Sequence, residues 1–70
     1  MEKERNLAFV EEKAYQMRLK MNVTQYEFAK LLDVSTSYVS NWENGYNEIT
    51  IVILNKICNI CHVSFDYMMG

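Results

Sequence analysis

The 70-residue chain has no proline, two glycines and a single histidine. This shortage of loop-forming residues argues against a loop-rich or many-stranded fold. No apolar run is longer than the four residues Ile51 to Leu54, which excludes a bilayer-spanning helix. The charged residues at positions 1–5 are not followed by a signal-peptide core. We therefore expect a cytoplasmic protein without a membrane segment, whose two cysteines stay reduced.

An excess of basic residues is also missing, because the formal net charge is -2. DNA-binding domains are usually basic, so the charge by itself does not indicate a nucleic-acid partner. Half of the residues are hydrophobic, which can supply the core of one small domain covering residues 1–70.

The sequence pattern predicts five helices and no strands. Apolar residues recur every three or four positions, and no segment shows sustained alternation. The expected helices cover residues 2–20, 25–32, 36–44, 51–61 and 65–69. The last four follow residues suited to an N-cap, which are Thr24, Ser35, Thr50 and Ser64. The third is expected to end at Asn44 and Gly45, with the glycine in the left-handed conformation.

Two of these helices, 25–32 and 36–44, are separated by only three residues, which is helix-turn-helix spacing. In that motif the first helix crosses the DNA backbone and the second enters the major groove. One face of the second helix is apolar, with Val39 and Trp42 directed to the core rather than serving as a stacking platform. The other face carries short polar residues, Thr36, Ser37, Ser40 and Asn41. Such side chains can hydrogen-bond base edges, although a merely solvated face is the alternative.

A longer pattern surrounds this motif. It comprises Thr24-Gln25, Phe28-Ala29, Leu32, Val34-Ser35, Val39-Ser40 and Trp42-Glu43-Asn44-Gly45. The pattern resembles the phage repressor/Cro-type helix-turn-helix family, also called the xenobiotic-response-element (XRE) family, over about residues 14–69. The resemblance implies an all-α, compact, five-helix lambda repressor-like domain. It also implies a transcriptional regulator, expected to be a repressor, that binds double-stranded DNA at a palindromic operator without a cofactor.

The resemblance assigns roles to individual residues. Gln25, Asn44 and Tyr46 would contact phosphates or the DNA backbone, and Arg18 would pair with Glu43. The chain also departs from the family pattern. Tyr46 and Asn47 stand where the family often has lysine or arginine, so we expect weak non-specific binding and a shallow salt dependence. Ile49 replaces a usual proline and His62 a usual glycine, which leaves the shape of two loops open.

The segment Cys58-Asn59-Ile60-Cys61-His62 matches the attachment pattern of c-type haem. Haem attachment requires export, however, and a structural zinc site needs about four ligands. We therefore interpret both cysteines as small core residues and expect neither a metal nor a cofactor. No nucleophile–base arrangement is recognisable, so we expect no enzymatic activity and no small-molecule substrate.

Apolar residues also occur where the family usually has polar ones, at Val52 and Ile53. Three further apolar residues are expected nearby, namely Ile60, Tyr67 and Met69. The five residues together predict an exposed patch that joins two copies into a homodimer. The alternative is a larger core packed against Leu7, Phe9 and Val10. A different function is also open, in which the same fold serves as a protein-interaction module and has lost DNA binding.

Overall fold

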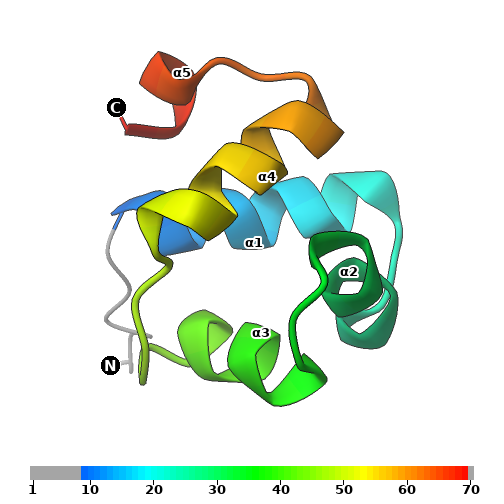
Figure 1. Ribbon diagram of the computed structural model, residues 1–70. Coiled ribbons are helices and arrows are strands. Elements are labelled where there is room, and N and C mark those ends of the chain that lie inside the picture. Colours follow the sequence, from blue (N-terminus) through cyan, green and yellow to red (C-terminus); the bar gives the residue numbers. More distant parts are fainter. Residues whose placement is uncertain (1–8, 70) are drawn as a thin grey trace.

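The computed structural model describes residues 9–69, and this part of the chain consists of five helices without a strand (Figure 1). The helices are α1 (Phe9–Met21), α2 (Gln25–Leu32), α3 (Thr36–Glu43), α4 (Ile51–Cys61) and α5 (Phe65–Met69). The predicted all-α class is confirmed, and α2, α4 and α5 have the predicted bounds. Helix α3 ends one residue early, because Asn44 is its C-cap. The predicted first helix before residue 9 lies outside the described residues.

Side-chain caps begin the helices where the sequence predicts them. The Thr24 hydroxyl accepts from the Glu27 backbone N–H (3.1 Å), and the Glu27 carboxylate accepts from the Thr24 backbone N–H (2.8 Å). The side chains of Ser35 and Thr50 cap α3 and α4 by accepting from the N–H groups of Tyr38 and Ile53, without the reciprocal contact. This geometry satisfies backbone donors that a helix start otherwise leaves unpaired.

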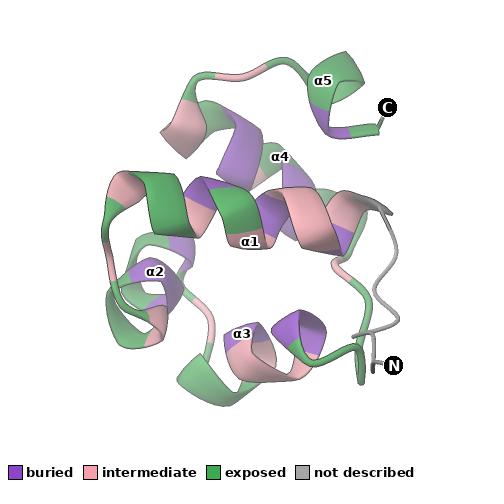
Figure 2. Cartoon of the chain, turned by 180° about the vertical axis from the view of Figure 1, so that it is seen from behind, coloured by how far each residue is buried: buried purple, intermediate pink, exposed green. Residues whose placement is uncertain are grey.

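The core is built around Trp42, whose side chain is fully buried. Its ring meets Phe28 edge-on at 6.3 Å and Tyr38 edge-on at 5.3 Å between centroids. Trp42 is therefore a core residue, as predicted. Buried residues line the inner sides of the helices (Figure 2). In both ribbon views α3 lies at the opposite end of the molecule from α5, so its outer side is not covered by another helix.

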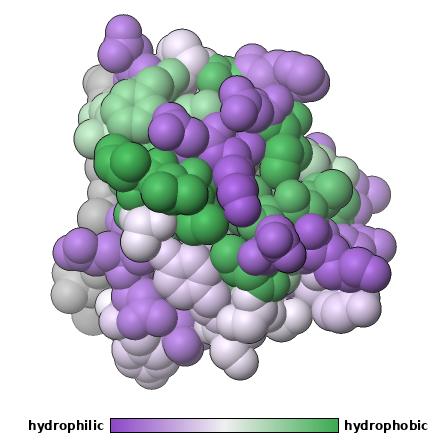
Figure 3. Space-filling view, in the orientation of Figure 1, coloured by the Kyte–Doolittle hydropathy of each residue, from purple (hydrophilic) through white to green (hydrophobic). Residues whose placement is uncertain are grey.

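The predicted apolar patch needs correction. Ile53 is only 8% exposed and belongs to the core, and Ile60 is half-buried against that core. Val52, Tyr67 and Met69 are exposed as predicted. Val10 packs against the core, as in the larger-core alternative, whereas Leu7 and the side chain of Phe9 lie outside the described part. A space-filling view shows apolar side chains over α4 and part of α5, and mostly polar ones over α3 (Figure 3).

Among the helices that the structure describes, none is long and apolar enough to cross a membrane. Within residues 9–69, no three His, Cys, Asp or Glu side chains come together in a way that could hold a metal ion.

Candidate nucleic-acid interface

The predicted reading face of α3 lies on the surface. Thr36 and Ser37 are exposed, and Ser40 and Asn41 are partly exposed. Val39 and Trp42, on the opposite side of the same helix, are fully buried. Burial of one side therefore fixes which side faces outward. All four predicted groove residues lie on one accessible stretch of helix.

The turn between α2 and α3 is held by backbone hydrogen bonds. Asp33 adopts a left-handed conformation (φ 61°), and the next N–H, of Val34, donates to the carbonyl of Ala29 at 3.0 Å. The Lys56 ammonium reaches over from α4 and donates to the Leu32 carbonyl at 3.2 Å. These contacts fix the angle between the two helices of the motif.

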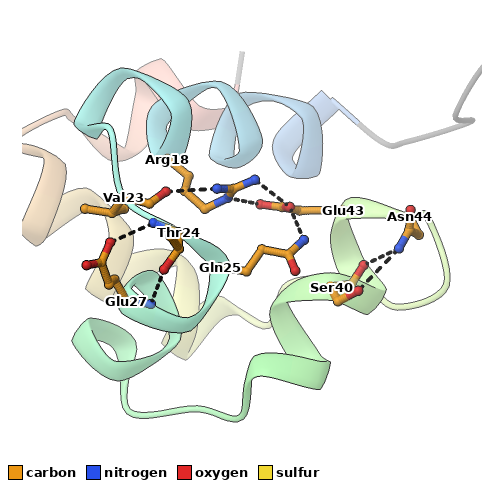
Figure 4. A network of polar contacts seen from close by, with 8 residues as sticks. All are labelled: Arg18, Val23, Thr24, Gln25, Glu27, Ser40, Glu43 and Asn44. Atoms are coloured by element: carbon orange, nitrogen blue, oxygen red, sulfur yellow. Dashed lines mark hydrogen bonds and ion pairs between the residues drawn. The ribbon is translucent and has the colours of Figure 1, made fainter.

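A buried polar network joins α1, α2 and α3 (Figure 4). Arg18 donates to both oxygens of Glu43, from Nε at 2.7 Å and from Nη2 at 3.1 Å. Its Nη1 donates to the carbonyl of Val23 at 2.9 Å, in the link before α2. Gln25 Nε2 also donates to Glu43, at 2.8 Å. The predicted ion pair between Arg18 and Glu43 is thus present, and it anchors the C-terminal end of α3.

Gln25, which was predicted to contact a phosphate, thus also has a hydrogen-bond partner within the domain. One amide hydrogen points to Glu43, which orients the carboxamide at the first residue of α2. The second amide hydrogen and the backbone N–H groups of Gln25 and Tyr26 are the donors left for a phosphate, because the Glu27 N–H already donates to Thr24. The phosphate contact itself stays a prediction.

Asn44 and Tyr46 follow α3 and differ in what they present. Asn44 Nδ2 donates back to Ser40, to its carbonyl at 2.9 Å and its hydroxyl at 3.4 Å (Figure 4). The Asn44 side chain thus closes the end of α3, which reduces what it can offer to a DNA backbone. The Tyr46 side chain is 78% exposed, while its N–H donates to the carbonyl of Asn41 at 2.8 Å.

Two residues that the sequence analysis did not single out hold the loop between α3 and α4. The Tyr38 hydroxyl donates to the Glu48 carbonyl at 3.0 Å and accepts from the Thr50 N–H at 3.3 Å. Glu11, which is 5% exposed, accepts from the Ile49 N–H at 2.7 Å. The sequence feature that could have indicated this contact is Ile49, because the proline usual at this position in the family has no N–H to donate.

The interface carries little positive charge. Lys13 donates to the Tyr67 carbonyl at 2.9 Å, and Lys56 is held at α2 as described above. Among the described cations, Lys20 and Lys30 are exposed. Three acidic residues of the motif and its following loop are exposed as well, namely Glu27, Asp33 and Glu48. The surface around α3 is therefore polar rather than strongly basic.

A helix-turn-helix family model matches residues 15–68. The chain belongs to the XRE-type helix-turn-helix family. This helix-turn-helix domain is 36% identical over 53 residues to the "HTH-type transcriptional regulator ImmR" of Bacillus subtilis, covering 76% of this chain and 42% of that protein. It is 30% identical over 54 residues to the "Antitoxin PezA" of Streptococcus pneumoniae, covering 77% of this chain and 34% of that protein.

Its fold is similar to the crystal structure of the clp gene regulator ClgR from C. glutamicum. The TM-score is 0.74 at 25% identity, and the match covers 86% of this chain and 78% of that chain. The predicted family and fold are thus confirmed. The helix-turn-helix domain spans less than half of the length of each of the two curated relatives.

Proposed function

We propose that this domain is a sequence-specific DNA-binding transcriptional regulator that reads the major groove with α3. The observation that carries the proposal is the accessible row of Thr36, Ser37, Ser40 and Asn41, opposite the buried Trp42. Short hydroxyl and carboxamide groups can donate to and accept from base edges, and Asn can bind adenine through two hydrogen bonds. A helix buried on its other side presents these groups with little freedom to turn.

The rest of the motif supports this docking. With α3 in the groove, the first turn of α2 meets the sugar-phosphate backbone. The remaining amide hydrogen of Gln25 and the backbone N–H groups of Gln25 and Tyr26 would donate to a phosphate. The exposed Tyr46 hydroxyl would contact the backbone beyond the other end of α3. Asn44 would contribute less, because its amide donates to Ser40.

We infer repression rather than activation. A domain that occupies the major groove of a promoter excludes polymerase by its volume alone. Activation needs a further surface that contacts polymerase productively. One relative is named a transcriptional regulator and the other an antitoxin, and the first name supports a role in the control of transcription.

We further propose that two copies bind a palindromic operator. A two-fold dimer presents two copies of α3 to half-sites about one helical turn apart. The exposed side chains of Val52, Tyr67 and Met69 on α4 and α5 are the surface proposed to join the copies. Each domain carries little positive charge, so its phosphate contacts add little affinity for DNA. Binding of the second copy supplies the additional affinity.

In vitro selection of bound duplexes tests the proposal. We expect an enriched palindrome, and Asn41→Ala should weaken its binding by about 5–150-fold, the equivalent of about 1–3 kcal/mol per base contact. Asn59→Ala is the matched control, because Asn59 is exposed on α4, away from α3. Equal affinity of both variants for the selected duplex would contradict the assigned reading face.

One observation favours a second candidate, a protein-interaction module on the same fold. The net charge is -2, and exposed acidic residues flank α3. DNA binders usually show the opposite sign of charge. A selection that enriches no duplex at low salt would favour this candidate over DNA binding.

A further inference from the structure

The thioether of Met21 meets the thiol of Cys61 where α1 and α4 end, and Cys58 lies one helical turn before Cys61. Cys58 and Cys61 are three residues apart on α4, so both lie on one face of the helix. The fold brings Met21, the last residue of α1, to the same place, with its Sδ 3.7 Å from Cys61 Sγ. Both helix ends lie at the side of the molecule away from α3 (Figure 1). The sequence spacing showed the cysteine pair but not the thioether, which comes from 40 residues earlier.

Both thiols are free. Cys58 is buried and Cys61 is partly buried. Burial, and after it the neighbouring Cys58, raises the pKa of the Cys61 thiol. A raised pKa disfavours the thiolate, which is the reactive form of cysteine. This argues against a nucleophilic role, while it leaves the sulfur lone pairs available to a metal that can displace the proton.

The donor set selects among metal ions. Within the described residues, no other His, Cys, Asp or Glu completes a cluster with the two cysteines. A structural zinc site needs about four such ligands, so zinc is not supported. Two thiols and one thioether are soft donors, and soft sulfur donors prefer Cu(I).

We propose that Cys58, Cys61 and Met21 form a binding site for one Cu(I) ion. Two copper–sulfur bonds form as both thiols release their protons, and Met21 adds a neutral third donor. One Cu(I) and two thiols thus give a copper dithiolate of charge −1 and two protons, with no change of oxidation state. Cys61 and Met21 are partly exposed, which gives the ion a path to the buried Cys58. The proposal is independent of DNA binding.

Anaerobic titration with Cu(I) against a chromophoric Cu(I) chelator tests the site on the intact chain. We expect one Cu(I) per chain, and X-ray absorption should count three sulfur neighbours. The variant Cys61→Ser should lose the ion to the chelator.

Met21→Leu keeps the size of the side chain but removes its sulfur, and Met68→Leu in the core on α5 is its matched control. We expect weaker binding and two sulfur neighbours for Met21→Leu, and no change for Met68→Leu. Circular dichroism of each variant separates loss of the site from loss of the fold. The proposal is overturned by failure of the folded wild-type chain to compete with the chelator, by one Cu(I) per two chains, or by unchanged binding in Met21→Leu.

Discussion

Arg18 holds both carboxylate oxygens of Glu43, at 2.7 Å from Nε and 3.1 Å from Nη2. The pair joins α1 to the end of α3 and is nearly buried, with side chains 12% and 4% exposed. A buried pair of this kind gives little net stability, since removing two charges from water offsets their attraction. Its main effect is on geometry, because it fixes the end of the helix that is proposed to enter the groove.

Arg18→Met should therefore destabilise the fold by about 3–5 kcal/mol, because the Glu43 charge stays buried without its cation. The double variant Arg18→Met/Glu43→Leu should lose less, since neither charge remains. Urea unfolding followed by fluorescence of the single, buried Trp42 measures both. Gln16→Met, on the exposed side of α1, is the control. If the double variant lost as much stability as the two single variants, Arg18→Met and Glu43→Leu, lose together, this description of the pair would be contradicted.

The contact between Glu11 and Ile49 predicts the effect of restoring the family's proline. Ile49→Pro removes the N–H that donates to Glu11, whose other oxygen is buried without a partner in the described structure. We expect a loss of about 1–3 kcal/mol in the free energy of unfolding. Ile49→Pro in a Glu11→Leu background should cost much less. If Ile49→Pro alone raised the free energy of unfolding, the hydrogen bond between Ile49 and Glu11 would contribute nothing to stability.

The sequence was sufficient for the parts of the fold that depend on local pattern. Thr24, Ser35 and Thr50 act as the N-caps that their positions predict, because capping depends on residues within one helical turn. Helix α4 ends where the sequence predicts, although His62 stands in place of the family's usual glycine. His62 itself adopts the left-handed conformation, with φ at 58°.

Long-range contacts were less accessible from the sequence. Ile53 reads as a surface residue by comparison with the family, yet the packing of α4 buries it. Glu11 and Tyr38 hold the loop before α4 through hydrogen bonds to residues of that loop. The residues next to them in the sequence do not indicate these contacts.

The shortage of exposed cations predicts a shallow salt dependence of DNA binding. Lys20 and Lys30, the exposed cations of the described part, would give a slope of log K against log salt of about −2 per chain. Asn47→Lys, in the exposed loop after α3, should steepen the slope by about 1. Asn59→Lys adds the same charge on α4 and should leave it nearly unchanged. Equal steepening in both variants would indicate that α3 and its loop do not face the DNA.

The proposed dimer predicts a charge-sensitive interface on α4. The Val52 side chain is 63% exposed, and Val52→Glu should shift sedimentation at micromolar concentration toward the monomer. Leu31→Glu is the control, because Leu31 is a comparably exposed apolar residue on α2. A chain that sediments as a monomer both free and on DNA would rule out the dimer.

The most direct test of the reading face is amide chemical-shift mapping of the domain with the selected duplex and with an unrelated one. We expect the selected duplex to shift the amides of Thr36, Ser37, Ser40 and Asn41 most strongly, with smaller changes at the first turn of α2. The unrelated duplex should leave these amides nearly unchanged at the same salt concentration. Shifts confined to α4 and α5, with α3 unaffected, would contradict the assignment of α3 as the reading helix.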